Sequence, residues 1–186
     1  MINVKSSLTI NSGTLLTGAN NTNDFGNVLR INGGVATMNN GEISNNPGIR
    51  PIFVHGDYAE GDNTETDTLA GTFNMTGGTI SNNYGGIYSV GTFIISGGTI
   101  SGNSISTGGG GGIFTAGTLT ISGGTISGNS SPGAGAGIDV SANNTHIGSL
   151  TMTGGTVSGN TTSGSGSGGG IAIINGASAT ISGTAK

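Results

Sequence analysis

Carboxylate side chains are concentrated in one short segment of this chain, and carboxylate oxygens are common ligands of Ca²⁺ in proteins. Five of the chain's eight acidic residues lie between Gly56 and Thr68. Their spacing is not that of an EF-hand loop, and it does not match the Gly-rich nonapeptide that binds Ca²⁺. We therefore expect a solvated acidic loop, with a Ca²⁺ site as the alternative and no other cofactor. The candidate ligands are Asp57, Glu60, Asp62, Glu65 and Asp67.

Hydroxyl side chains recur at fixed places in the repeated phrase Gly-Gly-Thr-Ile-Ser. In an alternating strand the Thr and Ser point away from the Ile between them, so we expect both to face outward. These residues are Thr79, Ser81, Thr99, Ser101, Thr125, Ser127, Thr156 and Ser158. The alternating segment before each phrase also places hydroxyl residues on its outward side, as at Thr118 and Thr120. Asn74 and Ile94 interrupt this outward row.

Such a flat lattice of hydroxyl groups has more than one interpretation. It could order water as an ice-binding surface does, or it could contact sugars or another protein. The alternative is that Thr simply suits exposed strands and keeps a rod of low charge soluble.

Groups that could perform catalysis are sparse on the expected strands. β-Helical enzymes that cleave acidic polysaccharides need carboxylates clustered on one face, to act as acid and base or to bind Ca²⁺. Here Glu42 and Asp139 are far apart in the array, and His55 and His146 are single residues in loops. We therefore expect a protein that is not an enzyme, with polysaccharide binding or cleavage as an alternative function.

The charge pattern restricts the possible partners. The formal net charge is −4, and only four residues are Lys or Arg. These are too few to neutralise a run of phosphates or to form a polybasic patch, so we expect neither nucleic-acid binding nor attraction to anionic membranes. The chain has no apolar run long enough to cross a bilayer, and its first residues are not those of a signal peptide.

Internal repetition indicates which elements position these side chains. The phrase returns with equivalent Gly residues 20 to 37 residues apart, which is typical of a solenoid. Within residues 71–91, alternating segments at 72–76, 79–81 and 87–90 are separated by Gly-rich corners. Three short strands per repeat predict one coil of a parallel β-helix. We expect an all-β β-solenoid, a single domain over residues 1–186 with about six coils.

Apolar residues of successive coils should form columns inside the solenoid. The first strand contributes Leu8, Ala36, Phe73, Phe93, Leu119, Leu150 and Ala179, and two residues later Ile10, Met38, Met75, Ile95, Ile121, Met152 and Ile181. The second contributes Leu15, Ile43, Ile80, Ile100, Ile126 and Val157, and the third contributes Ile87, Ile113, Ile138 and Ile171.

Asn residues recur at the corner after the second strand, where we expect a ladder of stacked amides. Asn tolerates the left-handed conformation and bonds neighbouring backbone groups. The ladder residues are Asn46, Asn83, Asn103, Asn129 and Asn160.

The spacing of the repeats varies while the strands stay constant, so we expect the additional residues to form loops between strands. The predicted loops lie near residues 55–68, 104–110, 130–136, 141–149 and 161–168. The first and last residues look like strands without a capping element, and open β edges pair with other strands. We therefore expect contacts with neighbouring repeats of a longer array, or with other copies that stack end to end into filaments.

The phrase Gly-Gly-Thr-Ile-Ser-Gly-Asn, with Phe/Leu-x-Met/Ile before it and Gly-Gly-Ile after it, resembles repeats of large bacterial surface proteins. It is similar to the β-helices of adhesins and autotransporter passengers, and to the Gly-Gly-Ala-Ile repeats of chlamydial polymorphic outer-membrane proteins. The Phe-x-x-Asn part of that last signature is absent after Phe73 and Phe93. The resemblance implies a right-handed helix, a hand that parallel β connections also favour. It further implies an extracellular or cell-surface location, and a structural or adhesive role toward a surface glycan or host protein.

Overall fold

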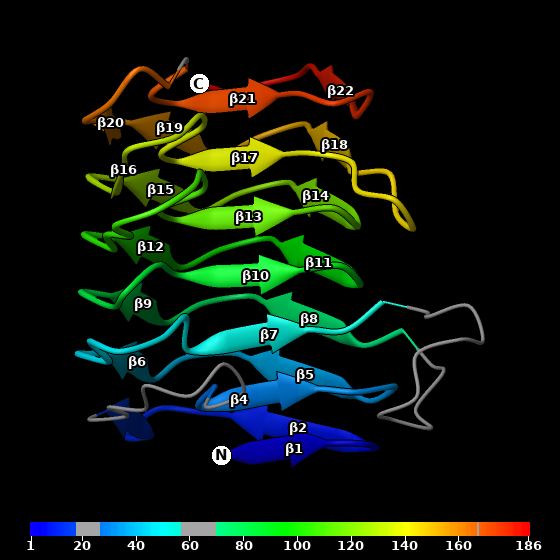
Figure 1. Ribbon diagram of the computed structural model, residues 1–186. Coiled ribbons are helices and arrows are strands. Elements are labelled where there is room, and N and C mark those ends of the chain that lie inside the picture. Colours follow the sequence, from blue (N-terminus) through cyan, green and yellow to red (C-terminus); the bar gives the residue numbers. More distant parts are fainter. Residues whose placement is uncertain (18–26, 57–69, 167) are drawn as a thin grey trace.

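The computed structural model describes residues 1–17, 27–56, 70–166 and 168–186, and in it the chain forms an all-β parallel β-helix. Three strands per coil and three stacked sheets confirm the predicted architecture. Figure 1 shows one sheet in front and two behind, with the first coil at the bottom and the last at the top. Within the described ranges, no helix has the length and apolar character needed to cross a bilayer.

Each coil contributes one strand to each of three parallel sheets, here called A, B and C in chain order. Sheet A contains β1 Ile2–Val4, β4 Leu29–Ile31, β7 Ile52–Val54, β10 Ile87–Ser89, β13 Ile113–Thr115, β17 Ile138–Val140 and β21 Ile171–Ile173. Sheet B contains β2 Ser7–Ile10, β5 Val35–Met38, β8 Thr72–Met75, β11 Thr92–Ile95, β14 Thr118–Ile121, β18 Ser149–Met152 and β22 Ser178–Ile181. Sheet C contains β3 Leu15–Thr17, β6 Glu42–Ser44, β9 Thr79–Ser81, β12 Thr99–Ser101, β15 Thr125–Ser127 and β19 Thr156–Ser158.

Several of the predicted loops contain paired backbone. Segments 130–136 and 161–168 begin with β16 Ser130–Ser131 and β20 Thr161–Thr162, which form a small fourth parallel sheet. Segment 141–149 contains an antiparallel bridge between Ala142 and Ile147. The turn between them is capped by Asn143, whose Oδ1 accepts hydrogen bonds from the backbone N–H groups of the residues two and three positions later.

The Gly-Gly pair turns the chain from sheet B to sheet C, and its two residues serve different purposes. At Gly98 φ is +86°, a value that an L side chain rarely adopts. At the preceding Gly97, a Cβ would collide with the carbonyl oxygen of Thr76 in the neighbouring coil. One Gly therefore supplies the backbone angle, and the other permits close approach of two coils.

The core is a set of apolar columns that run along the rod. Ile80, Ile100 and Ile126 stack in sheet C, and Phe73 stacks on Phe93 in sheet B with ring centroids 5.1 Å apart. These side chains are at most 2% exposed. In the last described coil, Ala179 and Ile181 hold the expected columns but are exposed, because β22 pairs on one side only, with β18.

One predicted inward residue is wrong. Leu15 pairs with Glu42 and is 56% exposed, whereas Leu16 pairs with Ile43 and packs against the core. Two residues separate Gly13 from the core side chain of Leu16, whereas in the other coils one residue separates the equivalent Gly from the core side chain. Because side chains alternate along a strand, that single shift exchanges the two faces.

The corner between sheets C and A contains a continuous amide ladder. The Nδ2 of each ladder Asn before Asn160 donates to the Oδ1 of the Asn in the next coil, at distances between 2.8 and 3.0 Å. The backbone N–H of each donor residue reaches the same oxygen, and the second Nδ2 hydrogen of Asn103 reaches the carbonyl of Ile80. The left-handed φ angles belong to the residues before the ladder, such as Asn82 at +55°, so the conformational reason predicted for the ladder residues themselves is wrong.

Candidate functional site

The proposed Ca²⁺ ligands, Asp57, Glu60, Asp62, Glu65 and Asp67, lie outside the described residues. In the described part of the chain, no group of three or more His, Asp or Glu side chains could hold a metal ion. The carboxylates of that part are Glu42 in sheet C and Asp139 in sheet A, so they lie on different faces of the rod.

The outer face of sheet B carries two columns of hydroxyl side chains in register. The first column contains Ser7, Thr72, Thr92, Thr118, Ser149 and Ser178, with Val35 as the exception. The second contains Thr9, Thr37, Thr120, Thr151 and Thr180, with Asn74 and Ile94 as exceptions. All of these side chains are exposed or half-buried, so no other segment of the described chain seals this face.

The outer face of sheet C is less uniform than we expected. Its threonines Thr79, Thr99, Thr125 and Thr156 align and are half-buried. Of its serines, Ser101 and Ser127 are half-buried and Ser158 is exposed, but Ser81 is buried, with 9% of its surface exposed. The prediction that Ser81 is exposed on the outer face is therefore wrong, and the more exposed hydroxyl surface lies on sheet B.

Sheet A carries an aromatic column on its outer face that the repeat pattern alone did not predict. The Tyr88 ring stacks on Phe53 at 5.1 Å and on Phe114 at 4.8 Å, with planes within 14° of parallel. The guanidinium of Arg30 lies 5.6 Å from the Phe53 ring centroid and continues the column. Each of the three aromatic residues occupies the middle of a third strand, and this recurrence was the signal that could have revealed the column.

Arg50 connects three coils beside the aromatic column. Its guanidinium donates to the carbonyl oxygens of Ile87 at 3.2 Å, Gly110 at 2.8 Å and Gly109 at 2.8 Å. Gly85 makes room for this side chain, since a Cβ there would lie 2.9 Å from Arg50 Cγ. Burial lowers the pKa of Arg50 to about 10, so the group remains charged at neutral pH.

Asp139 ends the aromatic column as a buried carboxyl group with 4% of its surface exposed. Its Oδ1 has no hydrogen-bond partner in the described chain. Burial raises the pKa of Asp139 to about 6, and the charge of Arg50 only partly opposes this change. A single carboxyl group can exchange a proton near pH 6, but no second carboxylate faces it from the described residues of sheet A.

The two His residues, which we predicted to be single in separate loops, lie in loops that meet. The His55 ring packs edge-on against Phe53, with centroids 4.3 Å apart. His146 Nε2 would lie 2.6 Å from a Cβ at Gly56, the residue after His55, so the 141–149 loop contacts the segment that follows β7. The His146 Nδ1 is 2.8 Å from the Thr145 hydroxyl.

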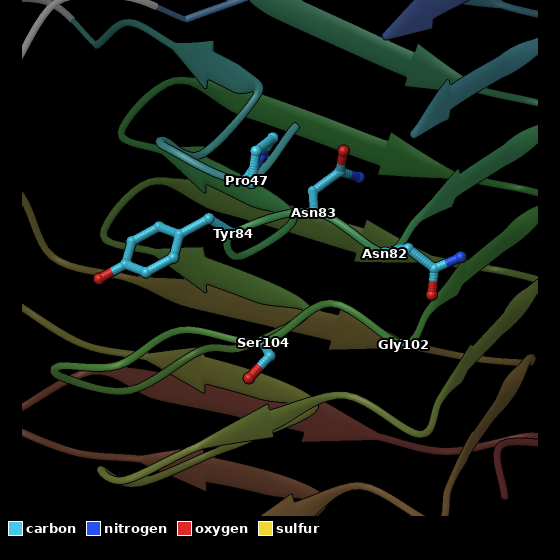
Figure 2. A pocket seen from close by; sticks show the side chains of 6 residues that line it. All are labelled: Pro47, Asn82, Asn83, Tyr84, Gly102 and Ser104. Carbon is cyan, nitrogen blue, oxygen red and sulfur yellow. The ribbon is translucent and has the colours of Figure 1, made fainter. Parts of the chain in front are cut away.

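A shallow pocket of about 310 Å³, wide open to solvent, lies at the Asn corner. It is lined by Pro47, Asn82, Asn83, Tyr84, Gly102 and Ser104. Figure 2 shows Tyr84 and Asn82 on opposite sides of this depression, with Pro47 on one edge and Ser104 and Gly102 on the other. The Tyr84 hydroxyl lies 2.5 Å from the Ser106 Oγ, and this hydrogen bond lowers the pKa of Tyr84.

Comparisons with protein-family models, with curated proteins and with solved structures gave no significant match.

Proposed function

We propose that this chain is a structural and adhesive β-helix segment of a bacterial cell-surface or extracellular protein, and that it is not an enzyme. The observation that carries the proposal is the outer face of sheet B, on which two hydroxyl columns extend along the rod, interrupted at Val35, Asn74 and Ile94, and no other described segment covers them. A face with this regularity suits contact with another extended surface. The repeated Gly-Gly-Thr-Ile-Ser-Gly-Asn phrase, which resembles surface-protein repeats, gives independent support.

The adhesive role is tested with beads coated with the purified chain and applied to glycan-coated surfaces and to epithelial cells. We expect the double variant T118E/T151E to reduce bead attachment at least fivefold, because it introduces two charges into the uncharged face. The control S158E adds a charge at an exposed position of sheet C and should attach like the unaltered chain. Equal attachment by all three coatings would refute sheet B as the adhesive face.

Ice binding is a second candidate function that the same columns favour. Residues on adjacent coils are separated by about 4.8 Å and alternate residues of one strand by about 6.7 Å, which gives a two-dimensional lattice of Thr and Ser hydroxyl groups, interrupted at three positions. We expect thermal hysteresis to disappear in T151Y, which places a bulky ring in the lattice, and to persist in T125Y on sheet C. Absence of ice shaping by millimolar unaltered protein would exclude this function.

A further inference from the structure

The Tyr84 pocket is a departure from the repeat that the fold does not require. The residue after each ladder Asn occupies one column along the corner, and parallel bridges join Tyr84 to Ser104 and Ser104 to Ser130. The later coils place Ser104, Ser130 and Thr161 in this column, so small residues satisfy the corner. The bulky ring of Tyr84 is thus an addition, and the absence of a side chain at Gly102 leaves space beside it.

We propose that this pocket binds one neutral hexopyranose residue of a glycan. Its volume lies at the small end of the range of about 300–1,000 Å³ that is typical of ligand pockets. An aromatic wall with a few polar groups matches a sugar ring, which has apolar C–H faces and a rim of hydroxyls. No residue that lines the pocket carries a charge, and this favours a neutral sugar over an acidic one.

Two polar side chains of the pocket have hydrogen-bonding capacity to offer a ligand. Asn82 is exposed, and its amide makes no hydrogen bond to the described residues, so it can both donate to and accept from sugar hydroxyls. The Ser104 Oγ accepts a hydrogen bond from the Ser130 hydroxyl at 2.8 Å, which leaves its own hydrogen available for a sugar oxygen.

The pocket is held in shape before any ligand arrives. Asn83 forms its buried base, and both hydrogens of its amide are engaged, by Ile43 O at 3.0 Å and Asn103 Oδ1 at 2.9 Å. A hydrogen bond between the Tyr84 and Ser106 hydroxyls holds the aromatic wall from the next coil. A rigid site loses little conformational entropy on binding, which matters for a ligand as small as one sugar.

This inference rests on the proposed adhesive function and names one ligand class for it. The two are distinguishable, because the adhesive face is sheet B and the pocket lies at the corner between sheets C and A. Failure of the pocket experiment would leave bead attachment through sheet B intact, and failure of the bead experiment would leave sugar binding in the pocket measurable.

The experiment is an NMR titration of the ¹⁵N-labelled full chain with the methyl α- and β-glycosides of glucose, galactose and mannose. We expect at least one glycoside to shift the backbone amides of Tyr84 and Ser104 and the side-chain amide of Asn82 in a saturable manner. We expect a dissociation constant of about 1 mM for a ligand of this size. If none of the six glycosides shifts these signals, the proposal is wrong.

Two variants alter the pocket in opposite ways while using residues that the repeat already accepts. Y84S installs the residue of the next two coils and removes the aromatic wall, and G102N installs the residue of the preceding coil and fills the space. Asn tolerates the positive φ of +63° at Gly102. We expect each to weaken binding at least tenfold while the amide spectrum of the other coils remains unchanged.

The matched control is Y88F, which alters a Tyr in the aromatic column of sheet A and should bind like the unaltered chain. Binding that survives in Y84S and G102N would overturn the proposal. Shifts confined to residues of sheet B would also overturn it, since they would place the sugar on the hydroxyl face.

Discussion

At the scale of single residues, the amide ladder is the most demanding polar feature of the rod. Asn103 is fully buried, and its Oδ1 accepts from both the backbone N–H and the Nδ2 of Asn83. Its own Nδ2 donates to Ile80 O and Asn129 Oδ1. Every polar atom of the side chain is therefore engaged, and a buried amide without partners would be costly.

We predict that N103A lowers the free energy of unfolding by about 2–4 kcal/mol, because it leaves buried donors of Asn83 without an acceptor. N103D has the same shape but cannot donate, so its carboxylate would face two acceptors; it should be less stable at pH 7 than at pH 4. Urea unfolding followed by circular dichroism measures both effects. N74A, at a half-buried position of sheet B, is the control and should change stability by less than about 0.5 kcal/mol.

Asp139 predicts a dependence of stability on pH. Its pKa is about 6 in the folded chain, above the ordinary value of 3.8 that applies to the unfolded chain, so between these values the folded state binds more protons than the unfolded state. The free energy of unfolding therefore falls as pH rises through this window, by an amount on the order of 1–3 kcal/mol, because each unit of pKa difference corresponds to about 1.4 kcal/mol.

We expect D139N to be more stable than the unaltered chain at pH 7 and to approach its stability at pH 4. Each protein is unfolded in urea at both pH values, and the difference between the two proteins is compared, which cancels the contribution of the other carboxylates. A difference that is the same at pH 4 and pH 7 would contradict the role assigned to Asp139.

At the scale of the structural element, the Gly-Gly corner sets how closely two coils approach. A Cβ at Gly97 meets the backbone oxygen of Thr76, so G97A must push coils apart, and we expect a loss of about 3 kcal/mol in stability. Gly128 has φ +63°, and the nearest atom of another coil would lie 4.0 Å from a Cβ there, so G128A adds only backbone strain, about 1 kcal/mol. Thermal unfolding measures the stability of both variants. Equal losses of stability in G97A and G128A would contradict the role of Gly97 in the close approach of two coils.

The elements themselves were readable from the sequence because their signals repeat. Alternation defines each strand, Gly-Gly marks one corner, and Asn marks another. The error at Leu15 arose where one additional residue entered a corner, because spacing from Gly13 no longer gave the face of the strand. Register is reliable only where the corner length is constant.

Features that depend on contacts between dissimilar segments were not predictable. Ser81 occupies its expected register but is buried, whereas Ser101 and Ser127 of the same column are half-buried, and the register alone does not give that difference. Arg50 reaches Gly109 across 59 residues, and no repeated pattern indicates that contact. The Tyr84 pocket likewise requires the meeting of three coils, and only its Tyr departs from the small residues that the later coils place in the same column.

At the scale of the whole molecule, each coil is stabilised mainly by its two neighbours, so equal substitutions should have unequal effects along the rod. Ile121 and Ile181 occupy one column of sheet B, linked through Met152. Ile121 is 1% exposed between two coils, whereas Ile181 is 56% exposed on the last coil. A comparison of these two residues therefore tests how much a core side chain's contribution to the free energy of unfolding depends on having a coil on both sides.

We predict that I121A lowers the free energy of unfolding by about 3 kcal/mol, because it leaves a cavity that neighbouring coils cannot fill. I181A should cost less than about 1 kcal/mol, and its effect should stay local: amide hydrogen exchange should accelerate in β22 and not in β11 or β14. I121A should accelerate exchange in β11, β14 and β18 together. If I181A destabilised the central strands as much as I121A does, stability would be a property of the entire rod and not a sum of contacts between adjacent coils.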